Sequence, residues 1–262
     1  MSNDPYAAPS SFVQDAPATA VDAEFVPGGQ NVAGGNGWEW IAQGWGLFRR
    51  EPGMWVALFV VFCLVVGGVG IVPFVGSIAT VLLGPVMTAG IISVCRTAEA
   101  GGELQISQLF DGFRSRTGAL VAVGALNLAA WVAIFLAAFL VMGAGVGFAA
   151  LKGAAGGDVG PGAIGGMLVG MLLVLALLVP VMMAVWFAAP LVYLHGQAPV
   201  EALKASFAGC LKNVVPFLVY GLVVLVLGVF ATLPFLLGWL VLGPVLAGSY
   251  YASYRDIYTR RA

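Results

Sequence analysis

Long apolar stretches dominate this chain, and charged residues separate them. Residues 52–95, 117–151, 159–200 and 213–254 contain no Asp, Glu, Lys or Arg. A helix rises about 1.5 Å per residue and the hydrocarbon core of a bilayer is about 30 Å thick, so one crossing needs about 20 apolar residues. The first and last stretches are each long enough for two helices and a turn.

Proline and glycine divide these stretches further. Pro73 and Pro234 lie at the predicted turns, and a glycine-rich loop covers 152–162. Pro180 and Pro190 leave two interpretations of 159–200, one kinked helix or two pieces. The sequence therefore predicts an all-α integral membrane protein with six transmembrane helices, near 54–71, 76–96, 118–150, 163–194, 214–233 and 236–256.

Three stretches before the predicted spans are amphipathic at helical spacing. In the first, Trp38, Ile41, Trp45 and Phe48 share one face, and similar patterns occur in 104–116 and 200–213. We expect three interfacial helices in the headgroup plane at the cytoplasmic side. Four aromatic residues are predicted interfacial anchors: Trp38, Trp45, Tyr250 and Tyr254.

The chain also predicts internal repeats. Pro73-Phe74 followed by Gly84-Pro85 resembles Pro234-Phe235 followed by Gly243-Pro244. Each predicted unit holds an even number of spans, so successive units have the same orientation and form parallel repeats. The predicted organisation is a disordered cytoplasmic tail over 1–36 and a six-helix transmembrane domain over 37–258, with units 37–98, 102–196 and 199–258.

Composition excludes several classes of protein. Of the 262 residues, 61% are hydrophobic and 9% are charged, and the mean hydropathy is +1.00, whereas a soluble domain has about 25% charged residues. Three cysteines in a chain of this length do not make a disulfide scaffold. A net charge of −1 without a long basic run argues against nucleic acid as a partner.

The few basic residues predict the orientation of the chain. With six spans and a cytoplasmic N-terminus, ten of the 11 Lys and Arg residues fall on the cytoplasmic side, and Lys152 is the exception. We therefore expect both termini in the cytoplasm and the chain in a bacterial inner membrane. The candidate contacts to lipid headgroups are Arg49, Arg50, Arg114, Arg116 and Lys212.

Glycines at intervals of four residues flank the predicted outer loop. Glycine lets two helix backbones approach closely in lipid. The predicted packing positions are Gly143, Gly147, Gly162, Gly166 and Gly170.

Catalytic chemistry is hard to assemble from this sequence. Asn127 is the most polar residue in the middle of a predicted span, and an interhelical hydrogen bond is its simplest role. His195 is the single histidine, and the three cysteines are scattered without a CxxC motif. We expect no enzyme, no cofactor and no metal site.

Parts of the sequence resemble two known families. Trp38–Gly53 and Leu109–Phe113 resemble an uncharacterised family of proteobacterial six-span inner-membrane proteins, and this resemblance covers about 38–256. Glu201–Phe207 is similar to the entry helix of the membrane domain attached to some glycerophosphodiester phosphodiesterases. That activity needs a separate barrel of about 250 residues, which 1–36 cannot provide.

The predicted function is therefore that of a non-enzymatic, multi-pass inner-membrane protein that interacts with lipids or partners at its cytoplasmic face. Membrane lipids are the expected partners, and a protein partner or a homo-oligomer stays open. The alternative is a small membrane transporter or channel for an apolar or amphipathic substrate, which requires a continuous cavity between the units.

Overall fold

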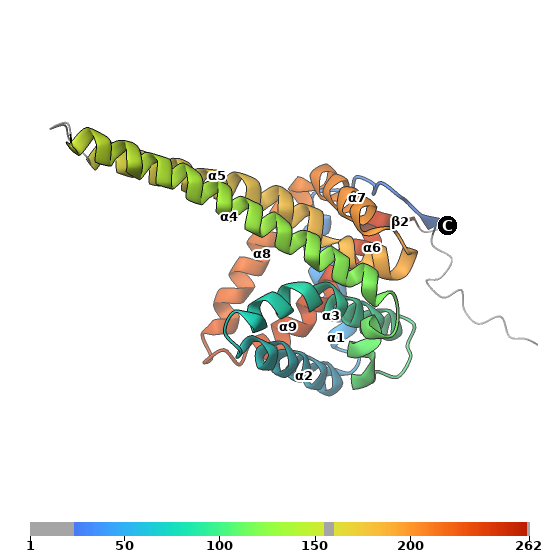
Figure 1. Cartoon of the computed structure of the whole chain (residues 1–262). Coiled ribbons are helices and arrows are strands. Elements are labelled where there is room, and N and C mark those ends of the chain that lie inside the picture. The colour runs from blue at the N-terminus through green and yellow to red at the C-terminus, as the bar shows by residue number, and fades with distance from the viewer. Residues whose placement is uncertain (1–23, 155–159, 261–262) are drawn as a thin grey trace, which may run out of the picture.

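Most of the chain is helical, as a membrane environment requires of backbone that cannot bond to water. The computed structural model describes residues 24–154 and 160–260. Figure 1 shows the helices gathered into one body, from which one hairpin projects. The elements are β1 (Glu24–Phe25), α1 (Asn36–Phe48), α2 (Pro52–Gly70), α3 (Val75–Glu99), the 3₁₀-helix η2 (Ile106–Phe113), α4 (Thr117–Ala154), α5 (Gly160–Trp186), α6 (Ala188–His195), α7 (Pro199–Lys212), α8 (Val214–Thr232), α9 (Trp239–Tyr258) and β2 (Thr259–Arg260).

Several helical segments can cross a bilayer, which makes this chain an all-α multi-pass membrane protein. Within the described residues, five are long and apolar enough: Pro52–Gly70, Val75–Glu99, Thr117–Gly145, Ile164–His195 and Val214–Thr232. The predicted sixth span coincides with α9, which is not among the five. Its C-terminal half carries tyrosines, Arg255 and Asp256 and packs inside the protein.

The described part of the stretch 159–200 begins with two consecutive helices that count as one candidate span, which agrees with the interpretation of one kinked helix. α5 and α6 are interrupted at Phe187, and together they count as one span. Pro190 has no N–H to donate to the carbonyl of Trp186 one turn earlier. That carbonyl instead accepts a hydrogen bond from the hydroxyl of Tyr250 at 2.5 Å.

A serine from α7 satisfies the other backbone groups at this break. Ser206 Oγ accepts a hydrogen bond from the N–H of Phe187 at 2.8 Å and donates one to the carbonyl of Met183 at 2.7 Å. Ser206 is fully buried. The break is therefore stabilised by side chains that lie far away in sequence.

Ser206→Ala is expected to lower the free energy of unfolding by about 1–3 kcal/mol, because it leaves the N–H of Phe187 buried without an acceptor. Thermal unfolding in mild detergent measures this effect. Ser107→Ala is the matched control, because Ser107 is exposed and makes a single long hydrogen bond of 3.4 Å. Equal melting midpoints for the two variants would contradict the role assigned to Ser206.

The helices α4 and α5 form a long antiparallel hairpin, which extends past the turns of the other helices in Figure 1. At about 1.5 Å per residue, the 38 residues of α4 reach about 57 Å, well beyond the thickness of a bilayer core. Large apolar side chains are exposed along both helices, among them Phe139 and Met171. Such exposure is expected for helices that contact lipid.

Glycines bring the two helices of this hairpin together, but at different positions on α4 from those predicted. A Cβ on Gly166 would lie 2.8 Å from the Cα of Gly145, and a Cβ on Gly170 would overlap the side chain of Met142. Around Gly143 and Gly147 there is open space, so these two are not packing positions. The predicted contact of Gly162 lies outside the residues whose packing is described.

Gly166→Leu is expected to destabilise the hairpin, because its side chain would overlap the backbone of α4. The neighbouring Gly165 provides a matched control, since open space surrounds it. Thermal unfolding of Gly166→Leu and Gly165→Leu in detergent makes the comparison. We expect a loss of about 2–5 kcal/mol for the first variant, typical of forced backbone shifts, and little change for the second. A fully stable Gly166→Leu would exclude the close contact.

The three predicted interfacial segments pack against other helices. α1 lies against α9, η2 against α3, and α7 against α5 and α6. The segment 104–116 forms a short 3₁₀-helix over Ile106–Phe113 rather than an α-helix. The residues predicted to share one face of α1 differ in their exposure. Ile41 is buried, next to the buried Trp40, whereas Trp38 and Trp45 are 55% and 44% exposed.

Residues 24–36, which belong to the tail predicted to be disordered, are bonded to the end of α7 and to β2. β1 pairs with β2 as an antiparallel ladder. Asn213 Oδ1 accepts a hydrogen bond from the N–H of Val32 at 2.8 Å. Lys212 Nζ donates to the carbonyl of Gly28 at 2.9 Å. The prediction for 1–23 lies outside the described residues.

Candidate functional site

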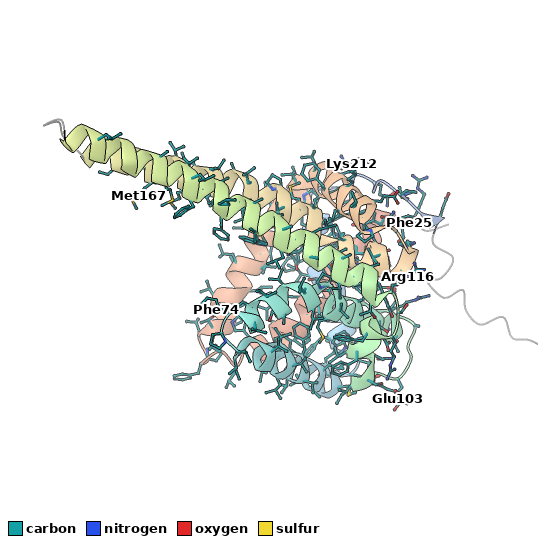
Figure 2. The ribbon with its side chains drawn as sticks, in the orientation of Figure 1. Phe25, Phe74, Glu103, Arg116, Met167 and Lys212 are labelled. Atoms are coloured by element: carbon teal, nitrogen blue, oxygen red, sulfur yellow. The ribbon has the colours of Figure 1, made fainter. Side chains whose placement is uncertain are left out.

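Polar and apolar side chains are separated along the molecule. Figure 2 shows Glu103, Arg116 and Lys212 at one end, together with Phe25. Phe74, in the turn between α2 and α3, and Met167, on the projecting hairpin, lie away from that end. The end that carries Glu103, Arg116 and Lys212 therefore suits polar ligands, and the spaces between the helices suit apolar ligands.

The five predicted headgroup contacts do not form one cluster. Arg114 pairs with Asp111 at 3.5 Å, and Lys212 is bonded to the N-terminal segment. The guanidinium of Arg116 lies against Gly196, in the link between α6 and α7. Only Arg49 and Arg50 share a site.

Arg49 and Arg50 line a polar pocket of about 670 Å³ between α1, α3 and α9. We call it the arginine pocket. A third arginine, Arg255, comes from the far end of the chain and was not among the predicted site residues. The lining residues are Gln43, Gly46, Leu47, Arg49, Arg50, Glu99, Tyr251, Ala252 and Arg255.

The arginine pocket has an excess of positive charge. Its single carboxylate, Glu99, forms an ion pair with Arg255 and accepts a hydrogen bond from the hydroxyl of Tyr251 at 2.9 Å. Arg50 donates to the carbonyl of Ala98 at 2.8 Å. The guanidinium of Arg49 has no hydrogen bond or ion pair with another described residue. An anion is the ligand that such a set of groups can bind.

A second site lies between the membrane helices. It is a cavity of about 690 Å³, which we call the membrane cavity. None of its lining residues carries a charge. They are Trp55, Leu58, Phe59 and Phe62 of α2; Thr80, Val81, Gly84, Pro85, Thr88, Ile91 and Val94 of α3; Leu109 of η2; Asn127 and Trp131 of α4; Val181, Met182, Val185 and Trp186 of α5; Ala189 of α6; Tyr220 and Val224 of α8; and Gly243, Pro244, Leu246, Ala247 and Tyr250 of α9.

Few polar groups line the membrane cavity, and some of them have partners within the chain. The hydroxyls of Thr80 and Thr88 bond to carbonyls one turn earlier, at 2.8 and 2.9 Å. Tyr220 is hydrogen-bonded to Ser249 at 3.0 Å. Asn127 is half-buried and makes no hydrogen bond to another described residue, so the predicted interhelical bond is not formed.

Two tryptophans of the wall also have unpartnered polar groups. The indole N–H groups of Trp55 and Trp186 are buried and have no acceptor among the described residues. Such groups are rare in proteins, and each calls for an explanation. They lie in the same wall as Asn127.

Proline shapes two walls of the membrane cavity. Pro85 and Pro244 lie inside α3 and α9, where each removes one backbone hydrogen bond. Next to them, Gly84 and Gly243 differ in their surroundings. A Cβ on Gly84 would meet nothing within 4 Å, whereas one on Gly243 would overlap the ring of Phe59. Gly84 therefore exposes helix backbone to the cavity.

The predicted aromatic anchors occupy two different environments. Trp38 and Trp45 are exposed, as an interfacial position requires. Tyr254 is 2% exposed, so the structure places it in the protein interior. The hydroxyl of Tyr250 bonds to α5 and its ring stacks on that of Phe187, so it is also an internal contact rather than a lipid anchor.

Reactive side chains are held in structural contacts. His195 Nε2 is hydrogen-bonded with the hydroxyl of Tyr254, and its ring stacks on Phe25 with the centroids 3.7 Å apart. Burial raises the pKa of the Cys210 thiol to about 12, although a hydrogen bond with Ser206 opposes the shift. The thiol is therefore protonated at neutral pH. Within the part of the chain that the structure describes, no three His, Cys, Asp or Glu residues lie close enough to share a metal ion.

Comparison with known proteins identifies a relative of this chain. A probable inner membrane protein of Burkholderia thailandensis is 32% identical over 250 residues, which cover 87% of this chain and 92% of the relative. The chain belongs to the family of this inner membrane protein. No protein-family model matches the chain, and no solved structure matches it. Membership of this family and the apolar helices together place the protein in the inner membrane.

Proposed function

We propose that this inner-membrane protein binds anionic lipids at its cytoplasmic face and catalyses no reaction on them. The observation that carries the proposal is the convergence of Arg49, Arg50 and Arg255 on one pocket with a single carboxylate, Glu99. Guanidinium groups bind phosphate through paired, charge-assisted hydrogen bonds. The pocket therefore fits the phosphate of a lipid headgroup.

The place of the arginine pocket in the chain supports a lipid rather than a soluble anion. The apolar helix α2 begins at Pro52, directly after Arg50 and Glu51. The pocket thus lies within about one helical turn of the hydrocarbon boundary. Trp38 and Trp45 are exposed on the same α1 and suit the headgroup layer.

The proposal includes six passes with both termini in the cytoplasm. α9 begins with the apolar segment Trp239–Val245 and ends near Arg255, so it supplies a sixth pass whose inner half is covered by protein. The positive-inside distribution of lysine and arginine supports this orientation. A protein partner or a homo-oligomer at the same face stays a prediction.

Two hairpins support the proposed parallel repeats. After Pro73 and Pro234, Phe74 and Phe235 both adopt a positive φ, of 59° and 51°. In both turns a glycine then lets the two helices of the hairpin touch. The packing of α1 on α9, η2 on α3 and α7 on α5 fits three units, each of which contacts the preceding one in a ring.

A transporter of an apolar or amphipathic substrate is the second candidate function. The membrane cavity favours it, because helices from all three proposed units line this space. Ligand sites of about 300–1,000 Å³ at the interfaces of structural units are common. The likeness of Glu201–Phe207 to the membrane domain attached to phosphodiesterases adds no catalytic residues to either candidate.

The combined variant Arg49→Ala/Arg50→Ala is expected to bind phosphatidylglycerol about 30-fold more weakly than the natural chain, because each arginine near a membrane surface contributes about 1 kcal/mol. The protein is purified in detergent micelles and titrated with labelled phosphatidylglycerol. The same titration with labelled phosphatidylcholine measures the part of the binding that does not depend on lipid charge.

Arg114→Ala is the matched control, because Arg114 is also an exposed arginine but lies outside the arginine pocket. We expect this variant to retain its preference for phosphatidylglycerol. A loss of about fivefold in the control, which is the share of one charge, would reduce the effect to total charge. No preference for phosphatidylglycerol in the natural chain would refute the proposal.

A further inference from the structure

We propose that the membrane cavity is a binding site for one neutral, hydrophobic molecule that carries a carbonyl or hydroxyl group, and that Asn127 bonds to this group. The inference is independent of headgroup binding in the arginine pocket. It follows from the volume of the cavity, the uncharged wall and the polar groups that the wall leaves without partners.

The volume and the wall determine the class of ligand. About 690 Å³ is enough for a drug-sized molecule or part of a lipid. Because no lining residue is ionisable at neutral pH, a charged headgroup would lose its hydration without gaining a counter-charge. The aromatic rings of Trp55, Trp131 and Trp186 add flat apolar surface. The wall therefore fits a neutral molecule.

Asn127 identifies the polar part of that molecule. It lies ten residues into α4, so its depth is about 15 Å, near the middle of a bilayer core. An amide without a partner in hydrocarbon is costly, and asparagine can both donate and accept a hydrogen bond. A carbonyl accepts from this amide, and a hydroxyl can do either.

Met182 supplies the route of entry. Its side chain lines the membrane cavity and is also 49% exposed on the lipid-facing side of α5. The cavity thus reaches the hydrocarbon region at a flexible, unbranched side chain. A hydrophobic molecule can enter from the bilayer without crossing water.

Gly84 provides a test that fills the membrane cavity without disturbing the packing. A side chain at this position would meet nothing within 4 Å and would point into the space that the ligand occupies. Gly221 on α8 is a matched control, because it is also surrounded by open space but does not line the cavity. Gly84→Leu and Gly221→Leu are therefore compared with the natural chain.

The experiment is mass spectrometry of neutral molecules extracted from the full chain after purification in mild detergent. We expect the natural chain and Gly221→Leu to retain one neutral species well above its share in the membrane, and Gly84→Leu to retain about tenfold less. Asn127→Leu, which keeps the side-chain size, is expected to reduce retention of the same species. Thermal unfolding checks that each variant is folded.

The identity of the retained species distinguishes its sources. A glycerol ester points to a membrane lipid, and ring carbonyls together with an isoprenoid tail point to a quinone. Equal retention by Gly84→Leu and Gly221→Leu, or neutral molecules only in their bulk membrane proportions, would overturn the proposal. Arg49→Ala/Arg50→Ala should leave retention unchanged, so failure at one site is separable from failure at the other.

Discussion

The contact between α1 and α9 is the interaction on which the rest of the structure depends. Gly44 and Gly248 let the two backbones touch, since a Cβ on Gly248 would lie 2.9 Å from the Cα of Gly44. Trp40 Nε1 donates to Asp256 at 2.8 Å beside this contact. The first and last helices that the structure describes are thereby joined.

Both candidate sites follow from this closure. The arginine pocket needs Arg50 from the end of α1 and Arg255 from α9, which lie next to each other only when the two helices are packed. The membrane cavity needs α9 as one of its walls, because Pro244 of α9 lines it together with Asn127 of α4. The hydrocarbon tails of lipids form no hydrogen bonds. Because few polar groups line the membrane cavity, the amide of Asn127 is available to bond to a ligand.

The sequence predicts the helices well because a bilayer permits few alternatives: the predicted 54–71 is found as Pro52–Gly70. The sequence predicts poorly which face of a helix contacts its neighbour, because small and apolar residues occur on every side of these helices. Thus Gly145 rather than Gly143 contacts α5. Arg50 could be predicted as a site residue from its position, whereas Arg255 and the membrane cavity depend on contacts between distant segments.

Cross-linking of α1 to α9 in native membranes tests the closure most directly. Gln43 and Arg255 touch at 3.1 Å, so Gln43→Cys and Arg255→Cys, in a chain whose own cysteines are replaced, should react with one short bifunctional thiol reagent. A protease site between α4 and α5 then separates the two halves. Our account predicts halves that stay joined after cleavage; halves that separate, with both cysteines modified, would contradict it.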